Sequence, residues 1–557
     1  MRRIAVLVAV VLCTLGAAAQ ETFFSESIEV RVLNVDVIVT DKKGAPVTGL
    51  TKDDFEVLEN GTAREITNFS EFRATPAAAA PNATQAPPLA PTDSRPRRIV
   101  IFLDEASLRS NTRNRVLPPI KSFVRKTLRR GDTAMIALWK PGLQIALPMT
   151  ADVAAFEAKL DAIAQTATMG RLAASEDHDM QMRIRTGATD MTQVGPRGSV
   201  SRPPISDGIG TAQTIATKAM HEQHEKVEAM KSVLASLRGV DGRKVFVFLT
   251  ESLTDIPGRD AFEYLERIKD LYEGGSSYVA SAVMAQYRDQ TLVPSLTEAA
   301  NSSSVSLYPI DAAGLGRDNE VLSAENLAGQ AIGVTSIRTS SDQRLHVLHE
   351  IAAATGGMAT TATDNFALTF DTIANDLTSY YSLGYRAEGD KQDQTRALSV
   401  KLKKKGYTIR TRQSLVEKSI NSEMGDAVAA NLFYPVEKNE LKIAMTAGAK
   451  TAVDTEHASV PVELKIPTAS LTLLPEGKEL TGKFSTYAAF VRDDGAVSQV
   501  KVQTHALRFP AESLARRKEV TVKLDVMIDN SVTGLSVGVM DDVAHTTGFA
   551  TVTLTPK

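Results

Sequence analysis

The feature that most limits the fold is a short, wholly apolar stretch between Arg98 and Asp104. It holds five consecutive apolar residues, three of them β-branched, and it ends in a carboxylate. A run of this length that does not alternate with polar residues is typical of a strand buried on both faces, as in a parallel sheet covered by helices. The stretch therefore predicts an α/β fold with this strand inside its sheet.

Two further stretches have the same form, Lys244–Thr250 and Val305–Asp311, and each has polar residues at or just beyond its end. Glu251 and Ser252 follow the first of them. In open α/β sheets, ligands bind at the carboxyl ends of the strands. The three stretches therefore predict one sheet with one functional rim, where Asp104 and Glu251 lie on adjacent central strands.

Several segments, in this order along the chain, make residues 20–415 resemble the von Willebrand factor A (vWA) domain, and most of all the vWA-related proteins of acidobacterial genomes. The resemblance implies a doubly wound, mainly parallel sheet of the vWA or Rossmann-like kind. The segments that carry it are IVIFLDEASLRS (99–110), GDTAMIALW (131–139), DGRKVFVFLTES (241–252), LHEIAAATGG (348–357) and YYSLGYR (380–386).

Many members of that family hold a divalent metal on an Asp-x-Ser-x-Ser motif, a distant Thr and a later Asp, and leave one position for a partner's carboxylate. The resemblance places Asp104 and Glu251 at two ligand positions, where Mg²⁺ or Ca²⁺ would bind if other oxygens completed the shell. Ala106 and Leu108 replace the hydroxyls of the motif, so the site is degenerate. The alternative is a rim without metal, whose carboxylates cap helix N-termini. The candidate helpers are Glu105, Ser107, Ser110 and Ser252.

Turn residues and hydrophobic alternation predict β-rich regions on both sides of the α/β region. Alternating runs between residues 441 and 554 predict an immunoglobulin-like β-sandwich. Three predicted strands between residues 380 and 412 are expected to extend or cover the central sheet. The complete prediction is a signal peptide (1–19), a small β domain (20–73), a Pro/Ala-rich linker (74–96), a vWA-like domain (97–415) and the β-sandwich (424–557).

Two segments of the vWA-like region do not fit its regular pattern. Residues 166–210 are rich in Met, Arg, Thr, Gly and Pro and lack sustained periodicity, which predicts a partly mobile insertion at the rim. Residues 312–340 form the second predicted insertion. Residues 273–290 are also expected to be irregular. Loops of such length in compact domains are usually functional or disordered.

The N-terminus has the parts of a secretory signal, with Arg2 and Arg3, an apolar core over residues 4–15, and three alanines at 17–19. A membrane anchor is the alternative, although a span needs about 20 apolar residues. The single cysteine, Cys13, lies in this signal, so the mature chain is expected to have no disulfide or thiolate metal site. These features predict a secreted or periplasmic protein without an integral membrane segment after cleavage.

The remaining motifs do not indicate catalysis. The sequence His221-Glu-Gln-His224 is one residue short of the His-Glu-x-x-His zinc motif, and a solvated helix face is the favoured interpretation. The glycines after Asp311 lack the third glycine of a dinucleotide-binding loop, so an ordinary loop is expected there. The sequence contains no Walker loop.

The leading functional hypothesis is a secreted, non-enzymatic module that binds another protein at or beyond the cell surface. The net charge of −3, from 63 basic and 66 acidic residues, does not indicate nucleic acid or an anionic membrane as a partner. No cofactor is expected, apart from Mg²⁺ or Ca²⁺ at the degenerate site. The alternatives are an exported hydrolase whose site is formed by the insertions, and a structural component of the envelope. The sequence identifies neither the partner nor the oligomeric state.

The signal predicts cleavage after Ala19, so that the exported chain begins at Gln20. N-terminal sequencing or intact mass of the exported protein checks this prediction. Retention of residues 1–19 would contradict it.

Overall fold

The structure is a computed structural model that carries side chains.

Four short 3-10 helices occur in the described part of the chain, namely η1 (Lys52–Asp54), η3 (Lys269–Leu271), η4 (Thr468–Ser470) and η5 (Ala511–Arg516). The structure describes residues 32–73, 95–140, 142–190, 192–194, 196, 200–273, 277–315, 345–386, 392–434, 439–455, 457–493 and 497–554. The predicted signal peptide and most of the predicted linker and 312–340 insertion therefore lie outside the described residues.

The central sheet is mostly parallel, with strand order β11-β10-β5-β6-β7. Only the edge strand β7 is antiparallel, and it pairs with β6. Beyond β11, Thr360 forms a single parallel bridge with Ile310. The strands are β5 (Arg97–Asp104), β6 (Thr133–Lys140), β7 (Gly142–Thr150), β10 (Arg243–Thr250) and β11 (Val305–Asp311).

Helices cover both faces of this sheet, as the apolar stretch of β5 predicts. Side chains of a strand alternate between faces, so Ile99 and Ile101 enter one hydrophobic cluster, and Val100 and Phe102 enter another. The first cluster includes α1 (Ser110–Thr127), α2 (Val153–Gln165) and α11 (Phe366–Thr378). The second includes the C-terminal half of α4 (Ile205–Ser236), α7 (Leu292–Ser302) and the helix over residues 345–354.

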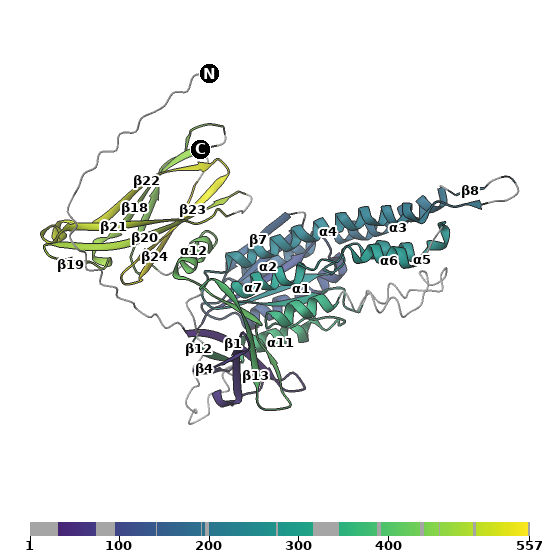
Figure 1. Ribbon diagram of the computed structural model, residues 1–557, viewed down its shortest axis with the longest axis horizontal. Helices are drawn as coiled ribbons and strands as arrows, with labels where there is room; N and C mark the ends of the chain where they lie inside the picture. Colours follow the sequence, from purple (N-terminus) through teal and green to yellow (C-terminus); the bar gives the residue numbers. More distant parts are fainter. Residues whose placement is uncertain are drawn as a thin grey trace, which may run out of the picture.

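The predicted insertion at 166–210 is not irregular, which corrects that expectation. It contains a helix whose Met180, Ile184 and Ala188 face α4 and α5 in a separate hydrophobic cluster. Their spacing of four residues is helical, but polar and small residues surround them. Figure 1 shows the resulting helical arm, which projects away from the rest of the molecule. The arm consists of α3 (Gly170–Asp190), β8 (Gln193–Val194), β9 (Val200–Ser201), the N-terminal half of α4, α5 (Arg259–Arg267) and α6 (Ser277–Ala285).

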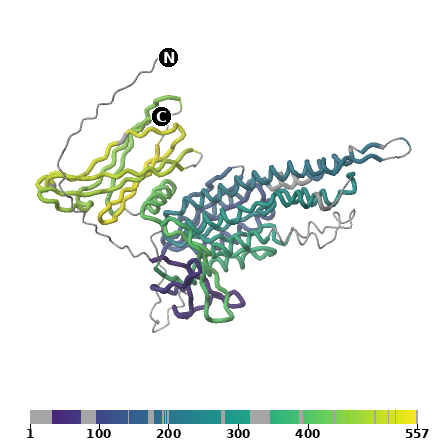
Figure 2. The backbone as a smooth tube through the Cα atoms, viewed as in Figure 1, coloured from purple at the N-terminus to yellow at the C-terminus, as the bar shows by residue number. Residues whose placement is uncertain are grey.

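The strands after residue 380 do not extend the central sheet, which corrects one of the two predicted alternatives. They pair with the N-terminal strands in two four-stranded sheets, ordered β14-β1-β12-β4 and β15-β13-β2-β3. The reason is their alternation, which directs Tyr381, Leu383 and Tyr385 into a cluster with Val35 and Val37. Figure 2 shows this intermixing of segments distant in sequence. The strands are β1 (Val32–Thr40), β2 (Phe55–Glu59), β3 (Thr62–Arg64), β4 (Ile66–Phe72), β12 (Tyr380–Arg386), β13 (Gln394–Leu402), β14 (Thr408–Arg410) and β15 (Ser414–Glu417).

The C-terminal region has two sheets, one with β16, β17, β18 and β22 and the other with β19, β20, β21, β23 and β24. Each predicted alternating run overlaps one of these strands. The helix α12 was not predicted, and the predicted boundary at residue 424 falls inside it. The elements are α12 (Ile420–Asn431), β16 (Ala444–Ala447), β17 (Thr451–Ala452), β18 (His457–Pro467), β19 (Leu474–Glu476), β20 (Glu479–Arg492), β21 (Lys501–Pro510), β22 (Glu519–Asp529), β23 (Val532–Asp541) and β24 (Thr547–Thr553).

Among the residues that the structure describes, no helix has the length and apolar character needed to cross a membrane.

Replacing Arg396 with Met should lower the free energy of unfolding by about 3–5 kcal/mol. The guanidinium joins the two segments of the N-terminal β region, because it contacts the buried carboxylates Glu59 and Glu417 at 2.6 Å each. Urea titration followed by circular dichroism measures the loss. The matched control is Arg508→Met, since Arg508 is exposed and should change stability by about 1 kcal/mol or less. Equal losses would contradict the prediction.

Candidate functional site

The candidate site lies between β5 and β10, where the chain order of the strands in the central sheet reverses. If the strands are counted along the chain from β5, with the bridge at Thr360 as the sixth, their spatial order is 3-2-1-4-5-6. This is the order of doubly wound sheets, whose ligands bind at the carboxyl ends of the strands on either side of the reversal. Those two strands are β5, which ends at Asp104, and β10, which ends at Thr250.

A buried lysine occupies the centre of this site. The Lys226 Nζ atom donates hydrogen bonds to Asp104 Oδ2 at 2.6 Å and to Ser252 Oγ at 2.7 Å. The exposed fractions of the Lys226 and Asp104 side chains are 7% and 1%. Asp104 Oδ2 also accepts hydrogen bonds from Thr250 Oγ1 and Ser107 Oγ, both at 2.7 Å. One carboxylate oxygen thus receives one ammonium and three hydroxyl donors, the third being Ser252 Oγ at 3.5 Å.

The second predicted carboxylate, Glu251, is paired with a different cation. Arg109 donates to it through Nε at 3.1 Å and through its backbone N–H at 3.4 Å, and the Thr112 hydroxyl also contacts it. Arg109 is the N-cap residue of α1, so Glu251 sits at a helix N-terminus, as in the alternative without metal. Ser107 connects the Asp104 carboxylate to the backbone of Glu251, because its Oγ donates to Asp104 Oδ2 and accepts from the Glu251 backbone N–H at 3.0 Å.

The residues that replace the hydroxyls of the vWA motif are directed into the protein. Leu108 is fully buried in the cluster on one face of the sheet, and Ala106 packs against the cluster on the other face. Both positions therefore contribute packing, and neither supplies an oxygen to the rim.

Two of the four candidate helpers lie apart from the Asp104 carboxylate. Glu105 forms a fully buried ion pair with Arg113 at 2.9 Å. Burial raises the pKa of Glu105 above its ordinary value, and the charge of Arg113 acts in the opposite direction. Ser110 Oγ is 3.0 Å from Thr168 Oγ1. Only Ser107 and Ser252 join the hydrogen-bond network around Asp104.

Lys226, Thr250, Arg109 and Thr112 were missed as site residues. Thr250 could have been identified from the sequence, since it is the last residue of a predicted buried strand and such positions lie at the rim. The sequence indicated Lys226 less clearly. Its spacing from Met230 and Val233 places it on the apolar, core-facing stripe of α4. A lysine on such a stripe is expected to snorkel to solvent, and nothing nearby in the sequence identifies Asp104 as its partner.

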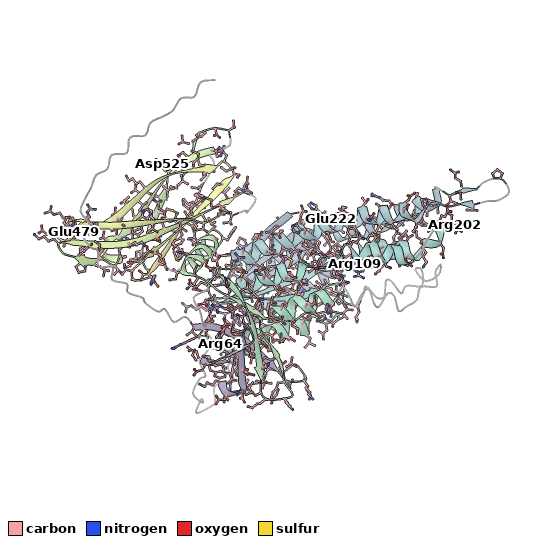
Figure 3. All side chains as sticks on the ribbon, viewed as in Figure 1. Arg64, Arg109, Arg202, Glu222, Glu479 and Asp525 are labelled. Carbon is pink, nitrogen blue, oxygen red and sulfur yellow. The ribbon has the colours of Figure 1, made fainter. Side chains whose placement is uncertain are left out.

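The predicted solvated face around His221 is confirmed. His221 is 74% exposed and pairs with Glu225 one turn later, and His224 is also exposed. Gln223 between them is buried and exchanges two hydrogen bonds with the backbone of Thr254. This contact and the Lys226 contacts attach α4 to the segment that follows β10. Figure 3 labels Glu222 on this helix and Arg109 at the rim.

The donor set at the rim fits a lysine ammonium better than a divalent cation. A hard cation needs about six oxygen ligands, and Asp104 already accepts from Lys226 while Glu251 accepts from Arg109. Within the described part of the chain, no group of three or more His, Cys, Asp or Glu residues is arranged to hold a metal ion. The arrangement can therefore supply positive charge and hydroxyl groups at the rim without a bound ion.

No family model matches the sequence, and no curated protein matches it. Among solved structures, the chain is similar to an aerotolerance-related membrane protein from Bacteroides fragilis, with 10% identity and a TM-score of 0.22 over 51% of this chain and 98% of the other. The protein BatB from Bacteroides thetaiotaomicron gives 10% identity, a TM-score of 0.21 and coverages of 51% and 97%. Proximal thread matrix protein 1 from the mussel byssus has 10% identity and a TM-score of 0.21, over 53% of this chain and 48% of that protein. Similarity at this level assigns no function to the chain.

Replacing Lys226 with Met should lower the free energy of unfolding by about 3–5 kcal/mol, because Asp104 would stay buried without its cation. The double variant Lys226→Met with Asp104→Asn should lose less than the sum of the two single variants. Urea titration followed by the fluorescence of Trp139, the single tryptophan, measures these changes next to β5. Lys231→Met, which removes a more exposed lysine of the same helix, should cost about 1 kcal/mol or less. Additive losses would contradict the coupling.

Proposed function

We propose that the chain is an exported, vWA-like module that binds another protein and has no enzymatic activity. We further propose that the two flanking β regions are sandwich-like domains and that the signal at the N-terminus directs the chain out of the cytoplasm. Three observations support the vWA-like assignment, namely the sequence segments that resemble the family, the 3-2-1-4-5-6 strand order, and the position of Asp104 and Glu251 at the reversal of that order.

The observation that carries the proposal is the contact between Lys226 and Asp104. In the vWA family, a metal ion at this position offers its charge to a carboxylate of the partner. Here the ammonium of Lys226 forms an ion pair with Asp104 at 2.6 Å, so a side chain of the protein supplies the positive charge in place of a metal ion. We infer that the rim binds its partner without a metal ion.

The groups that a partner would meet are those of the rim with access to solvent. Ser252 is exposed, and the Arg109 side chain is 22% exposed beside the buried Glu251. A hydroxyl and a guanidinium at one rim suit a carboxylate of the partner. The helical arm extends from this end of the sheet, from Arg109 near its base to Arg202 near its tip (Figure 3), and offers further surface to the same partner.

The best support for the alternative, an exported hydrolase, is the distance of 2.7 Å between Lys226 Nζ and Ser252 Oγ. A serine beside a lysine can act as an activated nucleophile when the lysine accepts the proton. The same Nζ atom, however, donates hydrogen bonds to both the Asp104 carboxylate and Ser252 Oγ, so the geometry presents it as a donor to the serine and not as an acceptor of its proton. Two cavities of about 420 and 190 Å³ occur elsewhere in the described part of the chain, and neither is lined by these residues. We therefore favour binding.

The test is a pull-down from the exported fraction with the mature chain, followed by calorimetry with the captured protein. Chelation by EDTA should leave the dissociation constant unchanged. Arg109→Ala should weaken binding by about tenfold, or about 1.4 kcal/mol, whereas Arg130→Ala, which changes an exposed arginine in the turn between α1 and β6, should not.

The proposal would be overturned by a metal requirement. Submillimolar binding of Mg²⁺, Ca²⁺ or Mn²⁺ that disappears in both Asp104→Ala and Glu251→Ala would make those residues metal ligands. Recovery of the same proteins by the Arg109→Ala variant with undiminished affinity would place the binding surface elsewhere. Failure to capture any protein would favour a structural component of the envelope.

A further inference from the structure

A second site lies at the opposite end of the central sheet, where the strands begin. A cavity of about 190 Å³ is formed there between β1, the start of β10, and the segments around residues 304–306, 355–356 and 412. It lies at the junction of the N-terminal β region with the α/β region, since its lining includes Asp36 from one and Arg243 from the other. This cavity shares no residue with the rim.

The lining of the cavity has a large excess of positive charge. Four cationic side chains face a single carboxylate, that of Asp36. Asp36 is 3.6 Å from the Arg95 guanidinium and 3.8 Å from that of Arg243, so neither contact is short enough for a hydrogen bond. One carboxylate cannot balance this charge. The four cations are Arg95, Arg243, Lys244 and Arg412.

Two arginines of this cavity, Arg243 and Arg412, have guanidinium donors without a hydrogen-bond acceptor in the described part of the chain. Arg243 is 7% exposed, and its Nη1 atom is buried without a hydrogen-bond partner. The guanidinium of Arg412 makes no hydrogen bond or ion pair within the described part of the chain, and burial lowers its pKa. Lys244 is 6% exposed, and its Nζ atom donates to the Leu237 carbonyl oxygen at 3.0 Å. Unsatisfied buried donors of this kind are costly, so the cavity is built to receive an acceptor.

We propose that this cavity binds a small divalent oxyanion, of the class of sulfate or inorganic phosphate. Guanidinium groups present parallel N–H donors that match the oxygens of such an anion, and the hydroxyls of Ser304 and Ser306 line the same space. The volume admits one small anion. Because β1 and β10 both contribute to the lining, the bound anion also fastens the N-terminal β region to the central sheet.

Calorimetric titration of the mature chain with sodium sulfate tests the proposal, with sodium chloride at the same ionic strength as the reference. We expect a submillimolar dissociation constant for sulfate and a higher melting temperature in its presence. Arg412→Gln should weaken sulfate binding by at least tenfold, because the unpaired guanidinium is lost. The matched control is Arg130→Gln, which removes an exposed arginine that does not line the cavity and should leave the affinity unchanged. Equal affinities in wild type and Arg412→Gln would overturn the proposal, as would no binding at all.

A second variant distinguishes loss of the site from damage to the fold. Asp36→Asn keeps the shape of the side chain but removes the only carboxylate of the lining. It should tighten sulfate binding by about threefold, an effect that misfolding cannot produce. Weaker binding in Asp36→Asn would contradict the proposed role of charge. Titration with phosphate and with succinate then separates tetrahedral oxyanions from dicarboxylates, and tighter binding of succinate would overturn the assigned class.

The pH dependence of sulfate affinity provides a further check. Burial, followed by the charges of nearby cations, lowers the pKa of Lys244 to about 7. Below this pH the lysine is charged and adds to the attraction, so sulfate should bind more tightly at about pH 6 than at about pH 8, a range where sulfate itself does not titrate. Lys244→Met should abolish this dependence, and its persistence in that variant would count against the site. The charged groups around Lys244 are Arg412, Lys418, Asp241 and Asp426, with Arg243, Arg95 and Asp36 in the cavity lining.

Discussion

The ion pair between Lys226 and Asp104 is the interaction on which the arrangement of the rim depends. Taking an ammonium and a carboxylate out of water is costly unless the two are paired and their remaining hydrogen-bonding groups are satisfied. Here Thr250, Ser107 and Ser252 satisfy them. Because the lysine belongs to α4, the pairing holds this helix across the ends of β5 and β10. The direction of the helical arm follows from that position, since α4 continues into the arm.

The two ends of the central sheet differ in how well the charges of their side chains are balanced. At the rim, Lys226 and Arg109 each have a carboxylate partner, so charge is balanced within the chain. At the other end, one carboxylate faces four cations, and Arg243 Nη1 is buried without a hydrogen-bond acceptor in the described part of the chain. Buried charges that are paired within the chain are compensated there, whereas buried charges in excess are costly and favour an acceptor from outside the chain. The same fold thus combines a rim whose two cations are paired with carboxylates and a sheet base that carries an excess of cationic side chains.

Much of the fold could be predicted from local patterns. The apolar stretch of β5 predicts burial on both faces, and the structure confirms this for Ile99 and Val100 alike. The grouping of Asp104, Ser107, Glu251 and Ser252 at one rim also followed from strand ends. These successes share one cause, which is that the period of a pattern within a few residues reports which side of a strand or helix is buried.

The contacts that escaped prediction join residues far apart in the sequence. Lys226 and Asp104 are separated by 122 positions, and Arg396 and Glu59 by 337. No local pattern specifies such pairs, so the lysine at the rim and the pairing of the N-terminal strands with those after residue 380 could not be inferred. The helix α3 was missed for a different reason, because its apolar residues, such as Ile184, are few and stand among small and polar ones.

The continuity of α4 gives the molecule a mechanical property. Its 32 residues span about 48 Å at 1.5 Å per residue, without a break between the arm and the central sheet. A load applied at the tip of the arm is therefore transmitted along a stiff rod to the place where that rod meets the sheet. Lys226 lies where α4 meets the sheet, and its Nζ atom contacts Asp104 and Ser252 at 2.6 and 2.7 Å. The position of the arm and the two hydrogen bonds of Lys226 are therefore linked geometrically through one helix.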